Sequence, residues 1–312
     1  MKERGVFFLV FLFLGFSLNA QTVRTAIMPE NPRPGEPVTI AVSDGSGVRS
    51  AALLVDGRRL SRTVFFSVPA DGENPPFLAA VIAIPSTARP GGAVIVLEAA
   101  SSGDSGSRMV TAIALTIAER EFASEVIALT PRLTGILTDP SPQRTDEANH
   151  LWAILNRVGD EVHGFDTFIP PVTSTRRTSR FGSRRVFQHA SGSSNTSIHA
   201  GVDYGVPSGT EISACGPGRV MLARNRIVSG YSVITEHLPG IYSLYYHMDY
   251  IEVAEGDLVA AGTRLGHSGA TGLATGPHLH WEIRVFGENT DPDAFLARPI
   301  LDINAILSKM YQ

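Results

Sequence analysis

The sequence contains one cysteine among its 312 residues, Cys215. The chain therefore cannot form an internal disulfide, and a structural zinc site built from four thiolates is excluded. Any catalytic metal would have to be held by histidine and carboxylate side chains. We interpret Cys215 as a small buried residue, because no catalytic role is left for it.

Charged residues are also scarce. Asp, Glu, Lys and Arg make up 18% of the chain, and the formal net charge is -4. Because binding to phosphate backbones needs a strong basic excess, the composition gives no reason to expect nucleic acid as a partner. Hydrophobic residues make up 43%, which is enough for two globular domains, each with its own core.

The chain lacks an apolar run long enough to make a membrane-spanning helix the first interpretation. A positively charged start, an apolar run over residues 6–18 and the small Ala20 instead predict a signal peptide over residues 1–20. We therefore expect an exported protein that is periplasmic, associated with the cell envelope or secreted. Leu18 fits a cleavage site poorly, so an uncleaved membrane anchor is the alternative, and no other membrane contact is expected.

No histidine precedes His150, and residues 21–118 contain no evident catalytic group. Turn-forming residues there separate five short apolar or alternating runs, which predict an all-β, immunoglobulin-like sandwich that serves as an accessory domain. A competing hypothesis makes this domain an adhesive or scaffold module with the main role in the protein. The five runs are Val38–Val42, Ala52–Val55, Leu78–Ile84, Ala93–Leu97 and Val110–Ile117.

Residues 119–175 are interpreted as a linker with one helix, over residues 147–158 and capped by Thr145 or Asp146. Pro170 and Pro171 then favour an extended chain. The basic cluster that follows has two readings, contact with an anionic substrate or a surface with structural ion pairs. Its members are Arg176, Arg177, Arg180, Arg184 and Arg185.

Residues 176–300 are rich in glycine and in short β-type runs, which predicts a second, mainly antiparallel β domain. Residues 301–312 are expected to form a C-terminal tail. Seven of the nine histidines lie between His189 and His280, all within this second domain.

Three patterns in this region carry chemistry. If residues 199–203 form a strand, His199 and Asp203 point to the same face, because side chains alternate along a strand. His278 and His280 share a face for the same reason and follow a glycine-rich loop. His247 comes after an apolar strand and by itself would be a core histidine.

Each pattern alone is weak, but together they define a catalytic centre. One carboxylate and two histidines make a metal site with three protein ligands and an open fourth position. Two further histidines remain to move protons. Zinc held in this way polarises a carbonyl and lowers the pKa of bound water, so the set is sufficient for amide hydrolysis.

These patterns belong to a longer series of motifs that resembles the lysostaphin/LytM-type zinc endopeptidases, whose catalytic domain has the duplicated hybrid motif fold. The resemblance covers roughly residues 180 to 296 and implies a zinc-dependent hydrolase acting on the peptides of bacterial peptidoglycan. Its main elements are Arg180-Phe-Gly-Ser-Arg184, His199-Ala-Gly-Val-Asp-Tyr-Gly-Val-Pro207, Tyr245-Tyr-His-Met248, Gly266-His-Ser-Gly269 and Thr275-Gly-Pro-His-Leu-His-Trp-Glu-Ile283.

The resemblance also implies roles. His199, Asp203 and His280 are the expected ligands of one zinc ion, and His247 and His278 the expected catalytic pair. A non-catalytic regulator of other wall hydrolases is the alternative, although relatives of that kind have lost ligands that are present here. Glu282, Tyr204 and Arg184 are weaker candidates for orienting a ligand or contacting substrate. Protein partners are not identified by the sequence.

Overall fold

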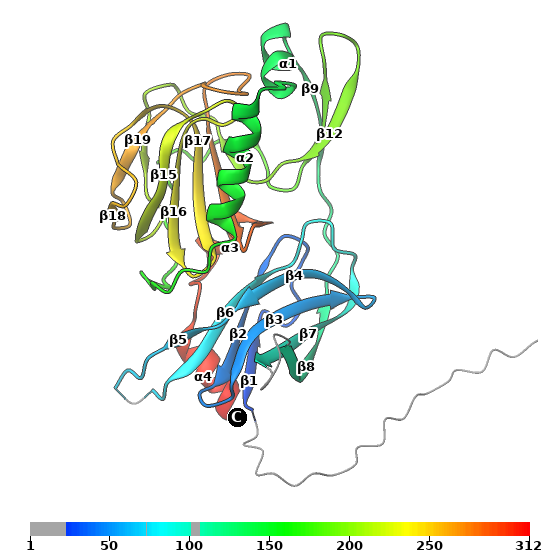
Figure 1. Cartoon of the computed structure of the whole chain (residues 1–312), viewed down its shortest axis with the longest axis vertical. Coiled ribbons are helices and arrows are strands. Elements are labelled where there is room, and N and C mark those ends of the chain that lie inside the picture. Colours follow the sequence, from blue (N-terminus) through cyan, green and yellow to red (C-terminus); the bar gives the residue numbers. More distant parts are fainter. Residues whose placement is uncertain (1–22, 73, 101–106) are drawn as a thin grey trace, which may run out of the picture.

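The computed structural model describes residues 23–72, 74–100 and 107–312. The predicted signal peptide lies outside these described residues. Within them, no helix is long and apolar enough to cross a membrane. The described chain forms two lobes stacked along the long axis, with the N-terminal strands in one and the histidine-rich segment in the other (Figure 1).

The N-terminal lobe consists of two four-stranded antiparallel sheets. The first has the order β1 (Thr25–Met28), β2 (Pro37–Ser43), β6 (Phe77–Ala83) and β5 (Phe66–Val68). The second has the order β4 (Arg58–Val64), β3 (Val48–Val55), β7 (Gly91–Ala100) and β8 (Ser107–Ile117). Ile40, Leu53 and Ile95 belong to one buried core that both sheets share, so the predicted β-sandwich architecture is present. The immunoglobulin-like assignment stays a prediction.

The first sheet is covered on both faces, which explains why β6 is an almost continuous apolar run. Val38 and Ile40 face the sandwich core, whereas Ala41 belongs to the core that also includes the second lobe. Thr39, on the same side as Ala41, donates a hydrogen bond to the Ile300 carbonyl at 2.9 Å. The two lobes therefore pack through this sheet.

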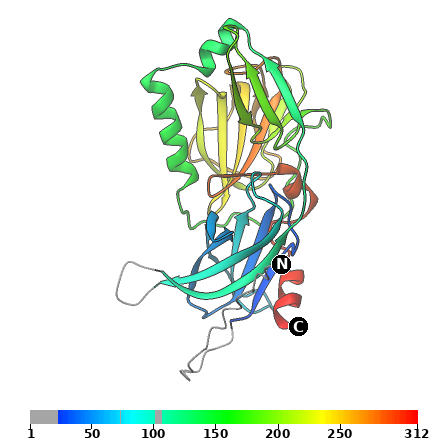
Figure 2. The same cartoon turned by 90° about the vertical axis from the view of Figure 1, so that its right-hand side faces the viewer.

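Residues 301–312 do not form a simple tail, so that expectation is wrong. Helix α4 (Ile303–Tyr311) starts at the N-cap Asp302, whose side chain accepts a hydrogen bond from the Ala305 amide. Ile306 and Met310 are buried, and the helix packs on β1 and β2. The C-terminal segment thus returns to the N-terminal lobe (Figure 2).

The segment between the lobes has more structure than the linker with one helix that we expected. It contains strand β9 (Ser124–Ala128) and two helices, α1 (Pro131–Leu137) and α2 (Pro142–Leu155). We refer to residues 119–155 as the connector. Helix α2 begins before the predicted position because Ser141, not Thr145 or Asp146, caps it, and because proline is well suited to the first turn.

The second lobe is built on a ten-stranded antiparallel sheet, as the sequence predicted. Its main path runs β10 (Arg177–Ser179), β13 (Val202–Tyr204), β20 (Leu279–Val285), β17 (Ile241–Ile251), β16 (Gly230–Leu238), β15 (Gly218–Arg226) and β18 (Leu258–Val259). Strands β14 (Glu211–Ser213), β19 (Arg264–Ser268) and β21 (Glu288–Thr290) branch from it, and the short helix α3 (Pro292–Ala297) follows. Beside it, β11 (Arg184–Gln188) pairs with both β12 (Ser194–Ile198) and the connector strand β9.

A chain of buried polar groups crosses the core of this lobe. His237 Nδ1 donates to the Pro217 carbonyl at 2.7 Å, and its Nε2 accepts from the Ser243 hydroxyl at 2.7 Å. Both ring nitrogens are satisfied by a neutral imidazole. Burial lowers the pKa of His237 from 6.5 to about 4. Cys215 lies beside this chain, fully buried, and burial raises the pKa of its thiol to about 12, so it is no ready nucleophile.

The buried His237 predicts a dependence of stability on pH. Its pKa is lower in the folded chain than in the unfolded chain, so below pH 6.5 the unfolded chain binds more protons. The free energy of unfolding therefore decreases as the pH is lowered. The contribution is lost progressively between pH 6.5 and about 4, and amounts to about 2 kcal/mol at pH 5. Urea unfolding at pH 7.5 and pH 5 checks this. The loss should be smaller by about that amount in His237→Asn, and equal pH slopes in the two proteins would contradict the assignment.

Candidate active site

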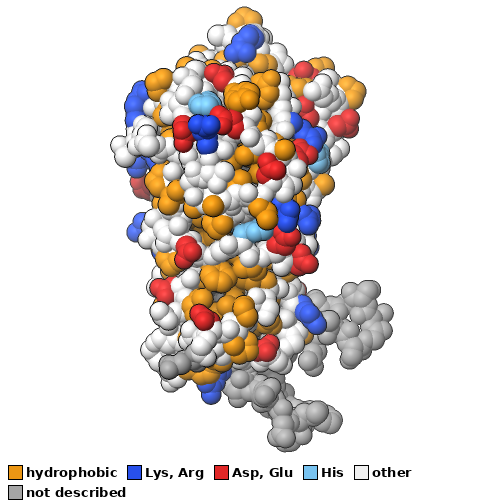
Figure 3. Space-filling model, turned by 90° about the vertical axis from the view of Figure 1, so that its left-hand side faces the viewer, with side chains coloured by type: hydrophobic (Ala, Val, Ile, Leu, Met, Phe, Trp, Pro, Cys, Tyr) orange, Lys and Arg blue, Asp and Glu red, His pale blue; other side chains and the backbone are white. Residues whose placement is uncertain are grey.

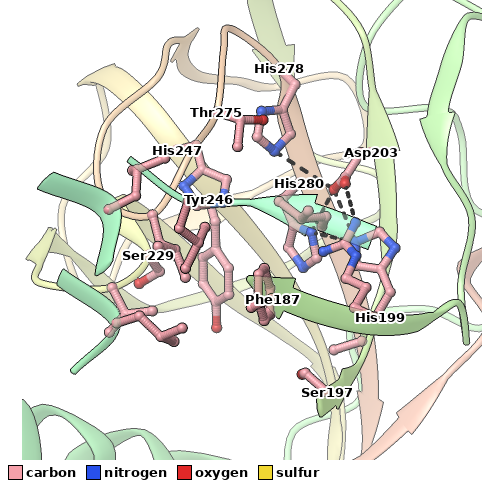
Figure 4. A pocket seen from close by; sticks show the side chains of 18 of the residues that line it. Phe187, Ser197, His199, Asp203, Ser229, Tyr246, His247, Thr275, His278 and His280 are labelled. Atoms are coloured by element: carbon pink, nitrogen blue, oxygen red, sulfur yellow. Dashed lines mark hydrogen bonds and ion pairs between the residues drawn. The ribbon is translucent and has the colours of Figure 1, made fainter. Parts of the chain in front are cut away.

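Three neighbouring strands bring the predicted site residues together. Asp203 on β13 is directly opposite His280 on β20, and His280 is in turn opposite Tyr246 on β17. Directly opposed residues of an antiparallel pair project from the same face. Asp203, His280 and Tyr246 therefore line one side of the sheet, where they border a cavity of about 300 Å³ (Figure 4).

His199 reaches this face by a different route from the one expected. The strand begins at Val202, so the prediction of one strand over residues 199–203 is wrong. His199 lies in the preceding turn, which passes so close to β20 that a Cβ on Gly201 would lie 2.1 Å from the Trp281 carbonyl oxygen. Only glycine allows this approach, and the same turn holds His199 with its Nε2 3.0 Å from Asp203 Oδ1.

Gly201→Ala is therefore expected to disturb the ligand set without removing a ligand. The added methyl group meets backbone, which cannot rotate away, so the turn has to move. Overpacking of this kind costs about 1–3 kcal/mol. We expect a lower unfolding temperature together with weaker binding of a metal ion by these side chains. Gly276→Ala is the matched control, because nothing lies within 4 Å of a Cβ at that glycine. Unchanged metal affinity in Gly201→Ala would contradict the role given to this turn.

Three donor atoms converge in the site. His199 Nε2 lies 3.0 Å from Asp203 Oδ1 and 3.0 Å from His280 Nδ1, and the last two atoms lie 2.7 Å apart. These three residues, all buried, are the group in the described part of the chain whose donor atoms are close enough to hold one metal ion. Ligands about 2.1 Å from a tetrahedral zinc would be roughly 3.4 Å apart, so the triangle is close to the required size.

The charges around these atoms also suit a cation. Asp203 is buried, which by itself disfavours its ionised form, but its interactions with His199 and His280 outweigh burial and hold its pKa well below the usual range. Burial likewise disfavours a charged His280, yet the hydrogen bonds with Asp203 and Glu282 raise its pKa to about 9. A place that stabilises a proton between two carboxylates stabilises a metal cation for the same electrostatic reason.

Side chains behind the ligands fix their orientation. His280 donates from Nε2 to Glu282 Oε1 at 2.9 Å, which leaves Nδ1 for a metal. Glu282 is held in turn by Arg284 at 2.7 Å. His199 donates from Nδ1 to the Arg180 carbonyl at 2.8 Å, which leaves Nε2 for a metal. Carboxylates and carbonyls behind histidine ligands set the ring tautomer in metal sites.

His247 and His278 stand together next to the ligand group. Their ring centroids are 4.8 Å apart, and His278 Nε2 lies 3.8 Å from Asp203 Oδ1. Each Nδ1 donates to a backbone carbonyl at 2.8 Å, that of Thr271 for His247 and that of Gly276 for His278. Both Nε2 atoms are thereby left as acceptors. His247 has a φ of 62°, a conformation rare for a residue with a side chain, and such strain is typical of functional positions.

The structure does not support two of the weaker candidates. Tyr204 follows Asp203 on β13 and so projects from the opposite face, where Arg177 stacks on its ring at 3.7 Å. Arg184 also points away from the site and donates to the Ser86 carbonyl at 2.7 Å. Neither residue lines the cavity. Glu282, by contrast, lines it and orients His280.

Sequence reasoning named Arg185 only as a member of the basic cluster and chose its neighbour Arg184 as the site candidate. Arg185 lines the cavity, and its Nη2 donates to Asp203 Oδ2 at 2.8 Å. A correct register for β11 would have found it, because the two arginines project to opposite faces. The basic cluster is thus engaged in structural ion pairs at Arg177 with Asp293 and at Arg185 with Glu125 and Asp203.

The wall that faces the ligand group is apolar and comes largely from the connector. None of the described residues that line the cavity precedes Ile127, so no described part of the sandwich contributes. The surface of the molecule differs from this wall: on the side shown in Figure 3, acidic and basic side chains are interspersed with hydrophobic ones. The connector and hairpin residues that form the wall are Ile127, Leu129, Leu133, Leu137 and Phe187.

Comparison with known proteins agrees with this geometry. Residues 197–292 match Peptidase family M23, so the chain contains a domain of that family. The chain is 35% identical over 137 residues to the DD-carboxypeptidase/endopeptidase Mpg of Neisseria meningitidis, a match that covers 44% of this chain and 30% of that protein. It is 34% identical over 129 residues to the peptidoglycan DD-endopeptidase ShyA of Vibrio cholerae, covering 41% and 29%. The matches thus span less than a third of the length of these curated relatives.

The fold as a whole has a counterpart among solved structures. A crystal structure from Pseudomonas aeruginosa, described as a candidate peptidase M23, superposes with a TM-score of 0.58 at 24% identity. The superposition covers 85% of this chain and 94% of that chain. At this identity the likeness is one of fold.

Proposed function

We propose that the chain is an exported, zinc-dependent endopeptidase that hydrolyses peptide bonds in bacterial peptidoglycan. The observation that carries the proposal is the tight triangle of donor atoms from His199, Asp203 and His280, with two acceptor imidazoles beside it. Membership of the matched domain in Peptidase family M23 supports the same reaction.

The donor set suits zinc. Two imidazole nitrogens and one carboxylate oxygen are ligands that zinc accepts, and three protein ligands leave a position for water or substrate, as in catalytic zinc sites. His199, Asp203 and His280 would hold one ion per chain. When bound, zinc lowers the pKa of a water molecule and polarises the carbonyl of the bond to be cut.

The two remaining histidines would move the proton. Burial lowers the pKa of both rings, to about 3 for His247, so each is neutral at pH 7. A neutral Nε2 that faces the cavity can accept a proton from the attacking water as its oxygen bonds to the carbonyl carbon. The same nitrogen can return the proton to the amine nitrogen when the carbon–nitrogen bond breaks. A protonated imidazole also stabilises the negative oxygen that forms in between.

The relatives suggest which bond is cut. Two of them are named as DD-endopeptidases or DD-carboxypeptidase/endopeptidases, so we propose a bond between D-configured centres in the cross-links that join stem peptides. The apolar wall of Leu129, Leu133 and Phe187 is suited to methyl-bearing residues. Because the sequence predicts a signal peptide, we propose that this reaction takes place in the periplasm, at the cell envelope or outside the cell.

Digestion of purified peptidoglycan, followed by mass spectrometry of the fragments, tests the proposal. We expect cross-linked fragments to give un-crosslinked ones, each cleavage adding one water, and we expect a chelated sample to release none. The fragment masses name the bond. Zinc-loaded protein that leaves every cross-link and stem peptide intact would overturn the proposal.

A further inference from the structure

Strand β9 of the connector is part of the structure that surrounds the ligand group. It pairs in parallel with β11, and the register places Glu125 beside Arg185. The segment just before β9 is held in place, because Arg120 forms an ion pair with Asp291 and stacks over Phe122. β9 is therefore a built-in third strand of the β11–β12 hairpin, although it lies well before the matched residues 197–292.

Glu125 makes two contacts that lead to two different ligands. Its Oε2 accepts from Arg185 Nε at 3.1 Å, and Arg185 donates onward to Asp203 Oδ2 at 2.8 Å. Its Oε1 accepts from the Ser179 hydroxyl at 2.7 Å. Ser179 Oγ lies 3.1 Å from His199 Nδ1, where it can accept the ring proton. The Glu125 carboxylate is thus linked to Asp203 through Arg185 and to His199 through Ser179.

The geometry has a direct consequence for the ligands. With Arg185 on Oδ2, Asp203 presents only Oδ1 to the other donors. With its proton engaged by Ser179 and the Arg180 carbonyl, His199 presents Nε2. Arg185 is itself held by two carboxylates, and its side chain is only 15% exposed, so the loss of one partner would free it to turn. Arginine gives directed contacts of this kind through its planar fork.

We propose that Glu125 is a positioning residue for the metal ligands Asp203 and His199, acting through Arg185 and Ser179, and that the connector is therefore a working part of the active site. The proposal rests on the proposed function only for the identity of the metal. The catalytic unit then begins at β9, not at residue 176 as the sequence suggested. It also follows that the docking of β9 and the affinity for metal are coupled.

Zinc affinity of the full chain, measured by competition with a chromogenic chelator, tests this without any substrate. Removing a side chain that orients a metal ligand typically weakens metal binding by 10–100-fold, roughly, and we expect this for Glu125→Ala. Glu125→Gln, whose single carbonyl oxygen can still accept a hydrogen bond from Arg185 and whose amide nitrogen can donate to Ser179 Oγ, should recover part of the loss. Glu121→Ala is the matched control, because Glu121 is exposed and lies in the same segment. Its affinity should equal that of the unaltered chain.

A second pair of measurements separates positioning from folding. Glu125→Ala and Arg185→Met should be less than additive in zinc affinity when combined, because both break one network. If Glu125→Ala lowers the unfolding temperature yet binds zinc as tightly as Glu121→Ala, the positioning role is wrong. If the unaltered chain binds zinc but cleaves no peptidoglycan, the proposed function fails while the zinc comparison still decides the role of Glu125.

Discussion

His280→Ala is expected to abolish zinc binding at micromolar protein concentrations and to lower peptidoglycan cleavage by about a thousandfold or more. His280 gives one of three donor atoms, and the loss of a bound metal removes several kcal/mol of transition-state stabilisation. Glu282 keeps Arg284 as a partner in the variant, so the fold should survive. Bound zinc is measured by elemental analysis after gel filtration, and cleavage by the release of soluble fragments.

His267→Ala is the matched control for this variant. His267 belongs to the same sheet, on β19, but does not line the cavity, and its nearest charged partner is Glu252 at 3.3 Å. It should retain zinc and activity. Cleavage by His280→Ala at a rate close to that of His267→Ala would remove His280 from the ligand set.

His247→Ala is expected to separate binding from chemistry. We predict a fall in kcat of about 10²–10⁴, because a positioned general base or acid contributes that much. Zinc content and KM should change little, since His247 Nδ1 is engaged by the Thr271 carbonyl and its ring is not among the converging donors. The measurement is steady-state cleavage of a cross-linked dimer of stem peptides, with zinc content determined on the same sample.

The half-buried His189 provides the comparison, because His189→Ala removes an imidazole from the same lobe outside the cavity. It should leave both parameters unchanged. A His247→Ala protein that loses its zinc would make His247 a ligand, and one that keeps full kcat would exclude it from the reaction.

The sequence was most informative where the spacing of residues matches the two-residue repeat of a β-strand. His280 on β20 and His278, in an isolated β-bridge just before that strand, both line the cavity, as their two-residue spacing on an extended chain predicts. The strands of the N-terminal lobe could be predicted from the sequence equally well. Their apolar residues alternate or cluster between turn signals, and all five runs coincide with strands, apart from Ile84 just after the end of β6.

Contacts between distant segments could not be read in this way. His199 meets Asp203 through a turn that depends on a backbone approach between Gly201 and Trp281, which no local pattern reports. Arg185, not Arg184, faces the site because of the register of β11, and a shift of one residue exchanges the faces of a strand. The role of residues 124–137 depends on parallel pairing across more than fifty residues, so their sequence reads as a linker.

A zinc titration of the metal-free chain tests the central claim most directly. The protein is stripped with a chelator, zinc is added in fractions of an equivalent, and cleavage of a cross-linked stem-peptide dimer is followed at each step. The account predicts no cleavage without metal and a linear rise that levels off at one zinc per chain. Cleavage by the metal-free protein, or zinc binding at one equivalent without any cleavage, would contradict it.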